Sequence, residues 1–239
     1  MADPFGRAVH DRWRDEQSEP LVQREGSTAR EHATEMYLGE FAAESEDGQW
    51  LESRLDGPLL DMGAGAGRLA LCFQERFETV AIEASEHLVE TMDERGVRNA
   101  RHVDMFALRE AFGRDRFRSA LAIGTQAGLA GSMGGLRQFL GDLAAVTTPD
   151  AIAVFECYDP ERERTAELLG YRADPTPGLA SRTMHFEYGE VVGETLLFRL
   201  FSPDRLREAA VGTGWTVVDV RRSPGEHPCP YTATLETSS

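Results

Sequence analysis

The chain has 239 residues, with 41 acidic and 25 basic side chains and a formal net charge of −16 at pH 7. Nucleic-acid backbones are bound by basic stripes, and none is evident in a chain of this charge, which argues against a nucleic-acid partner. No apolar run reaches the ~18 residues of a membrane helix, and no N-terminal signal pattern is visible, so we expect a cytoplasmic protein without a membrane partner.

The basic residues are all arginines, because the sequence contains no lysine. A dense carboxylate surface is tolerated in molar salt, where the Debye length is only ~3 Å and self-repulsion is screened. We therefore expect a halophilic protein. The three cysteines, Cys72, Cys157 and Cys229, match neither a disulfide framework nor a metal-ligand spacing, so no metal site is predicted.

The first 50 residues differ from the rest of the chain. Residues 4–16 and 28–43 have helical character, and Pro20 separates these two runs. We expect an N-terminal helical segment at 1–50 and one larger domain at 51–239.

Residues 58–68 read PLLDMGAGAGR and carry the most informative pattern. The apolar run that stops at Asp61 predicts a buried strand, and a helix is expected from Arg68. Three alternate glycines lie between them, at Gly63, Gly65 and Gly67. Such glycines permit a tight turn and close approach of the backbone to a ligand. A dinucleotide-binding fingerprint would need glycine at position 68, where this sequence has Arg68. An ordinary strand-to-helix turn is the alternative interpretation of the whole pattern.

Two further predicted strands, 77–82 and 100–103, also run into acidic residues. Glu83 follows the glycine loop at about the spacing of a ribose-binding acid in βαβ nucleotide sites. Asp104 follows the next strand, after a helix expected over 85–95. Either carboxylate alone is explained as a solvated loop residue, but acids at three successive strand ends favour a nucleoside site.

Later elements keep the alternation of strand and helix. Strands are predicted at 117–123 and 151–156, with a loop from Gly124 to Ser132 and a helix behind it. That helix has one apolar stripe, formed by Leu136, Phe139, Leu140, Leu143 and Val146. The alternation predicts an α/β fold with a doubly wound, mostly parallel sheet that binds ligands outside the carboxyl ends of its strands.

An insertion of about residues 160–201 follows the fifth strand. Its runs 181–188 and 194–201 predict an antiparallel hairpin. Ser202 then begins a helix with Pro203 at its first position, and two last strands are expected at 215–220 and 231–235.

The motif D-x-G-x-G-x-G, the loop GTQAGLAGS, the strand end ECYDP and the segment SPDRLREAAVGTGW together resemble a microbial group of class I S-adenosylmethionine-dependent methyltransferases of undefined function. The resemblance covers roughly residues 3–236. It implies a Rossmann-like sheet of seven strands, a helical lid at 1–50, S-adenosyl-L-methionine as cofactor, and methyl transfer to a small-molecule acceptor.

The cofactor residues that this resemblance implies surround the glycine loop. Asp61 would lie near the ammonium group, Glu83 would accept from the ribose hydroxyls, and Asp104 would contact the adenine amino group. The full predicted set is Asp61, Gly63, Ala64, Gly65, Gly67, Glu83, Ala84, Asp104, Met105 and Gly124.

Residues for the methyl acceptor are expected elsewhere. Asp159 and Tyr158, at the end of the fifth strand, are the catalytic candidates, although a general base is needed mainly for protonated acceptors. The acceptor and lid candidates are Tyr37, Gln126, His185 and Arg199. The alternative for Asp159 is a turn, because Asp-Pro also serves as one. Packing is the alternative for Tyr37, and a solvated role is the alternative for His185 and Arg199. The acceptor, the methylated atom and the oligomeric state, including a homodimer, stay open.

Two other functions are compatible with these patterns. A protein that binds S-adenosylmethionine or a related nucleoside without transferring methyl groups would share the same cofactor residues. An NAD(P)-dependent oxidoreductase would use a similar sheet, but Arg68 replaces the third fingerprint glycine.

Overall fold

A computed structural model describes residues 2–222 and 230–237 of the chain, so Cys229 lies outside the described residues. The chain forms two compact units. The first comprises Met1–Met105 and His185–Glu194, and the second comprises Phe106–Met184 and Thr195–Ser239. The predicted boundary at residue 50 stays a prediction.

The first unit contains three parallel strands and the segments that precede them. Its elements are α1 (Pro4–Trp13), β1 (Val22–Glu25), β2 (Thr28–Glu31), α2 (Glu35–Leu38), α3 (Glu46–Arg54), β3 (Leu59–Met62), α4 (Arg68–Phe73), β4 (Thr79–Glu83), α5 (Glu86–Arg95), β5 (Ala100–His102) and β10 (Val191–Val192). Strands β3 and β4 are almost wholly buried, as their apolar sequences require. Both pairings, of β3 with β4 and of β4 with β5, are parallel, so their carboxyl ends face one edge.

Residues 22–31 correct the prediction of a helix over 28–43. They form an antiparallel hairpin, β1–β2, and only Glu35–Leu38 is helical within the predicted run. Strand β1 also pairs with the end of β9 (Leu179–Tyr188), with Arg24 opposite His185. This partner lies far away in the sequence, and main-chain pairing with it outweighs the local helical preference.

The second unit contains the remaining strands and their helices. Its elements are α6 (Leu108–Ala111), β6 (Phe117–Ala122), the 3₁₀ helix η1 (Gln126–Ala130), α7 (Met133–Val146), β7 (Thr147–Tyr158), the 3₁₀ helix η2 (Glu163–Glu167), β8 (Tyr171–Ala173), the larger part of β9, β11 (Leu196–Phe201), α8 (Pro203–Ala210), β12 (Trp215–Arg222) and β13 (Pro230–Thr237). Here β6 and β7 are parallel, while β13 pairs antiparallel with both β7 and β12.

The predicted apolar stripe and hairpin are both confirmed. All five stripe residues of α7 are buried. Strands β9 and β11 pair antiparallel, with Met184 opposite Leu196, and β8 adds to the other side of β9. Ser202 caps α8, since its hydroxyl accepts from the N–H of Arg205.

The seven-stranded sheet has the order β12-β13-β7-β6-β3-β4-β5. The predicted α/β class with a mostly parallel sheet is therefore confirmed. Among the helices of the described residues, none is both long and apolar enough to cross a membrane.

Candidate functional site

The glycine loop between β3 and α4 has the predicted geometry. Its glycines have left-handed φ angles, 64° at Gly63, 58° at Gly65 and 80° at Gly67. The loop is fixed to β4 because the N–H of Ala64 donates to the carbonyl of Ile82 at 3.0 Å. A Cβ at position 67 would lie only 2.6 Å from a methyl group of Val97, so this position requires glycine for space as well as for φ.

Asp61 is a buried carboxylate beside this loop. It is 2% exposed, and its Oδ2 atom has no hydrogen-bond partner among the described residues. Burial, with the charge of Glu83, raises the pKa of Asp61 to about 7, although a main-chain hydrogen bond from Ala70 and the charge of Arg68 oppose this. A buried oxygen without a donor is costly, so the site favours a ligand that brings a cation or an N–H group.

Glu83 ends β4 and is held by main-chain donors. Its Oε2 atom accepts from the N–H of Gly65 at 3.0 Å, and its Oε1 atom accepts from the N–H groups of Ala84 at 2.8 Å and Ser85 at 3.3 Å. Burial raises the pKa of Glu83, and these three donors counteract the rise. The carboxylate therefore joins the glycine loop to the start of α5.

The predicted adenine residues follow β5. The N–H of Val103 donates to the carbonyl of Glu83 at 3.0 Å, which places the next residues at the same strand edge. Asp104 is exposed there, whereas Met105 is 6% exposed. Asp61 in β3, Glu83 at the end of β4 and Asp104 after β5 thus all belong to the carboxyl-end edge of these strands.

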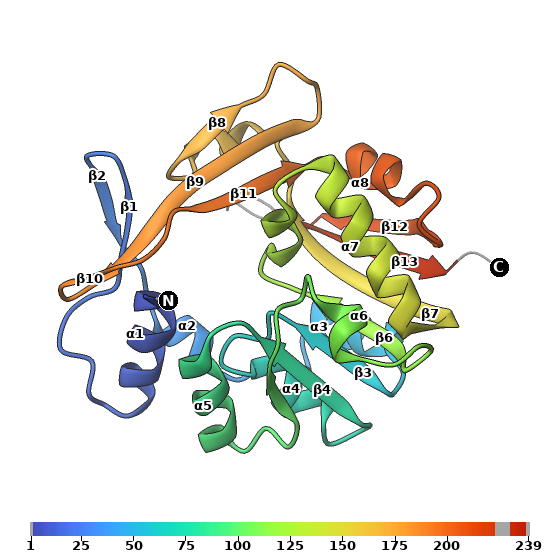
Figure 1. Cartoon of the computed structure of the whole chain (residues 1–239), viewed down its shortest axis with the longest axis horizontal. Helices are drawn as coiled ribbons and strands as arrows, with labels where there is room; N and C mark the ends of the chain where they lie inside the picture. Colours follow the sequence, from blue (N-terminus) through green and yellow to red (C-terminus); the bar gives the residue numbers. More distant parts are fainter. Residues whose placement is uncertain (1, 223–229, 238–239) are drawn as a thin grey trace. The chain divides into compact units, whose positions relative to one another are not determined.

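The N-terminal segment packs against the glycine loop. Helices α1 and α5 lie side by side (Figure 1). Phe5, Tyr37 and Leu38 contact a small core made of Val9, Ala66 and Leu88. The hydroxyl of Tyr37 lies 2.7 Å from Nε2 of His32, and the rings of Tyr37 and Phe5 form a T-shaped pair with centroids 5.0 Å apart. Tyr37 therefore lies close to the loop and packs against this core.

His185, the other lid or acceptor candidate in this unit, belongs to a charged network. Its Nε2 atom is 3.1 Å from Oε1 of Glu187, which also accepts from Nε of Arg24 at 2.7 Å. This network joins β1 to β9.

The second unit contains the remaining predicted residues. The N–H of Gly124 donates to Oε2 of Glu156 at 2.8 Å, so the ends of β6 and β7 are connected. Gln126 begins η1 and is half-buried. Tyr158 is also half-buried, and burial raises the pKa of its hydroxyl.

Asp159 and Arg199 are both occupied by ion pairs. Asp159 is 1% exposed, its Oδ2 atom is 3.0 Å from Nη2 of Arg222, and its Oδ1 atom accepts from the N–H of Glu161 at 3.1 Å. Arg199 pairs with Asp174 at 2.5 Å, which lowers the pKa of Asp174 to about 2. Both arrangements are those of side chains that stabilise the fold, and the catalytic role of Asp159 stays a prediction.

One residue near the loop was not predicted from the sequence. Arg95, at the end of α5, donates to the carbonyls of Ala66, Tyr37 and Leu38. The sequence predicted it only as the last residue of the helix expected over 85–95, and no local pattern could reveal these distant acceptors.

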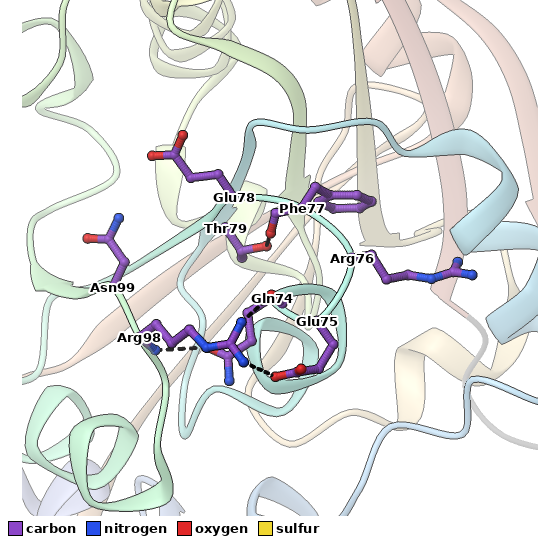
Figure 2. Close-up of a pocket in the computed structure, with 8 residues that line it drawn as sticks. All are labelled: Gln74, Glu75, Arg76, Phe77, Glu78, Thr79, Arg98 and Asn99. Carbon is purple, nitrogen blue, oxygen red and sulfur yellow. Dashed lines mark hydrogen bonds and ion pairs between the residues drawn. The ribbon is translucent and has the colours of Figure 1, made fainter.

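A cavity of about 420 Å³ lies elsewhere in the first unit. Figure 2 shows its lining residues, which surround the start of β4 rather than the end that carries Glu83. The guanidinium of Arg98 is already engaged there by Glu75 and by the carbonyl of Gln74. Within residues 2–222 and 230–237, no cluster of His, Cys, Asp and Glu could hold a metal ion.

No protein-family model and no curated protein matches the sequence, so similarity is found only among solved structures. A SAM-dependent methyltransferase from Bacteroides fragilis, in complex with S-adenosyl-L-homocysteine, has a TM-score of 0.79 and 23% identity, covering 100% of this chain and 96% of that one. The CcbJ methyltransferase from Streptomyces caelestis has a TM-score of 0.66 and 15% identity, covering 99% and 98%.

A third similar structure is the 1,6-didemethyltoxoflavin-N1-methyltransferase of Burkholderia thailandensis, with bound 1,6-didemethyltoxoflavin and S-adenosylhomocysteine. Its TM-score is 0.58 at 18% identity, covering 100% of this chain and 92% of that one. The chain therefore has the fold of the S-adenosylmethionine-dependent methyltransferases.

Proposed function

We propose that the protein is an S-adenosylmethionine-dependent methyltransferase that acts on a small molecule. The observation that carries this proposal is the buried Asp61, whose Oδ2 atom has no donor, beside a left-handed glycine loop and the carboxylate of Glu83. Carboxylates in this arrangement suit a ligand with an ammonium group and a ribose, and they suit a pyrophosphate poorly because of their charge.

The residues present fit this cofactor. Asp61 would pair with the ammonium group, Glu83 would accept from the ribose hydroxyls, and Asp104 would accept from the adenine amino group. The glycine loop, including Ala64, offers an approach unobstructed by side chains: a Cβ at Gly65 would meet no atom within 4 Å. Met105 and Ala84 complete the set in this unit. Gly124 belongs to the second unit, and its cofactor role stays a prediction.

When bound, the cofactor would supply a methyl group on a sulfonium. An acceptor lone pair would bond to the methyl carbon in line as the carbon–sulfur bond breaks, with S-adenosylhomocysteine as the leaving group. The main task of the chain is then to position the two reactants, and such positioning accounts for several kcal/mol of a barrier. We propose that Tyr158, half-buried at the end of β7, faces the acceptor, together with Gln126. The contacts described above hold the segments of His185 and Tyr37 in the first unit and that of Arg199 in the second, and an acceptor role for each stays a prediction.

Asp159 is the weaker of the two catalytic candidates. Both of its oxygens already accept, from Arg222 and from a turn N–H, so removal of a proton from an acceptor would require these contacts to break. The pairing supports a role in fixing the turn after β7.

Two other functions predict different behaviour. A non-catalytic S-adenosylmethionine-binding protein would bind the cofactor without turnover, and an NAD(P)-dependent oxidoreductase would bind a nicotinamide nucleotide. The absence of a third fingerprint glycine and the buried acid beside the loop count against the oxidoreductase. We further propose a cytoplasmic protein adapted to high salt, without nucleic-acid or membrane partners.

Methyl-labelled S-adenosylmethionine tests the proposal directly. The protein is incubated with the labelled cofactor and a pool of small metabolites in molar KCl, and S-adenosylhomocysteine is quantified. We expect turnover that depends on the pool and that Glu83→Gln reduces. Cofactor binding without turnover across chemically diverse pools would support the non-catalytic alternative instead.

A further inference from the structure

One guanidinium contacts three segments that are far apart in the sequence. Nη1 of Arg95 donates to the carbonyl of Ala66 at 2.7 Å and to the carbonyl of Tyr37 at 3.3 Å, and Nη2 donates to the carbonyl of Leu38 at 2.7 Å. The same group lies 5.6 Å from the ring centre of Trp13. Arg95 therefore touches the glycine loop, α2 and the end of α1.

The contacted loop residue is itself covered by the N-terminal segment. Ala66 is 2% exposed and packs with Val9 of α1 and Leu88 of α5, and Tyr37 and Leu38 lie against this cluster. A movement of α2 away from α5 would thus expose Ala66 and break two of the hydrogen bonds of Arg95.

Arg95 is an unusual group to find at such a junction. Its side chain is half-buried, burial and then the charge of Arg68 lower its pKa, and in the described part of the chain no carboxylate forms an ion pair with it. A planar guanidinium can donate to several carbonyls at once, in fixed directions, whereas a lysine ammonium has no such fork. Arg95 can therefore form all of these hydrogen bonds only while the glycine loop and α2 hold one position relative to each other.

We infer that Arg95 is a positioning residue that couples the glycine loop to residues 34–38 of the N-terminal segment, so that cofactor binding in the loop and docking of this segment favour each other. The inference rests on the proposed function, because it takes an adenosyl amino acid as the ligand of the loop. Coupling of this kind is reciprocal, so it can be measured from either end.

Hydrogen exchange and calorimetry of Arg95→Met, with S-adenosylhomocysteine as the probe, test the coupling. In the wild-type protein we expect the ligand to slow amide exchange in residues 34–38. In Arg95→Met we expect that protection to be lost and the ligand to bind about tenfold more weakly, as for one lost charge-assisted hydrogen bond. Arg95→Lys keeps the charge without the fork and should restore at most part of the protection.

The matched control is Arg12→Met. Arg12 joins α1 to α2 through an exposed ion pair with Glu35 at 3.0 Å, and among the described residues no hydrogen bond or ion pair joins it to the loop. We expect this variant to keep both the ligand affinity and the ligand-dependent protection. A merely structural role of Arg95 would change unliganded stability but would leave the response of residues 34–38 to ligand intact.

The outcomes separate the two proposals. Wild-type protein that binds the probe without protecting residues 34–38, or Arg95→Met that keeps the protection, overturns the coupling while leaving the proposed function standing. If the wild type binds no probe, the proposed function fails, and the coupling, which takes this ligand, is overturned with it.

Discussion

Replacing Asp61 with asparagine removes a buried charge and keeps the shape of the side chain. The pKa of Asp61 is about 7 in the fold, against an ordinary value of 3.8. Because the folded chain binds this proton more tightly than the unfolded chain, the contribution to stability is greatest below about pH 4 and is lost as the pH rises through about 7.

The difference between the folded and unfolded pKa of Asp61 corresponds to about 4 kcal/mol of stability, of which about 2–3 kcal/mol is lost between about pH 5 and pH 8. An asparagine does not titrate, so it avoids this loss of stability. Its amide N–H₂ would take the place of Oδ2, which has no partner among the described residues, and the unsatisfied donor would cost about 1–3 kcal/mol at either pH. Relative to the wild type, Asp61→Asn should therefore gain about 2–3 kcal/mol in free energy of unfolding between about pH 5 and pH 8.

Urea unfolding of the unliganded proteins at these two pH values, in constant KCl, measures this change. Asp104→Asn is the control, since its carboxylate is exposed, and its stability relative to the wild type should change by less than about 0.5 kcal/mol. If the relative stability of Asp61→Asn is the same at both pH values, Asp61 does not carry a raised pKa and the electrostatic account of the site is wrong.

Three further predictions concern binding, the fold and salt. Affinity for S-adenosylhomocysteine should rise about tenfold from about pH 6 to pH 8, because Asp61 must ionise to pair with the ammonium group; calorimetry measures this, and an equal rise in Asp61→Asn would contradict it. Asp159→Asn should lower the free energy of unfolding by about 1–2 kcal/mol through loss of the pair with the partly exposed Arg222, and a stability equal to that of the wild type would speak against the pairing. The melting temperature should rise from dilute buffer to molar KCl, because 41 acidic residues face 25 basic ones; an unchanged value would remove the halophilic proposal.

Local patterns predicted the parts of the fold that local forces determine. The glycines of the loop have left-handed φ angles, and Ser85 caps α5 through the N–H of Leu88. The apolar stripe of α7 is buried throughout. Each of these features is fixed by residues a few positions apart, so the sequence displays it directly.

Contacts between residues far apart in the sequence were not predicted, because no local pattern contains both partners. Strand β1 is stabilised by pairing with β9, where Arg24 meets Glu187 across 163 positions of sequence. The acceptors of Arg95 are carbonyl groups, which every residue carries, so no residue type marks them. Asp159 looked like a turn residue or a base, and only its distance to Arg222 shows that it is paired.

Titration of the wild-type protein with S-adenosylhomocysteine in a calorimeter, in molar KCl and in dilute buffer, tests the central claim most directly. We predict saturable binding in at least the high-salt buffer, weakened at least tenfold by Glu83→Gln, and no comparable heat from NADH. Absence of binding to a folded wild-type protein in both buffers, or equal binding by Glu83→Gln, would contradict the assignment of the glycine loop and its carboxylates as the cofactor site.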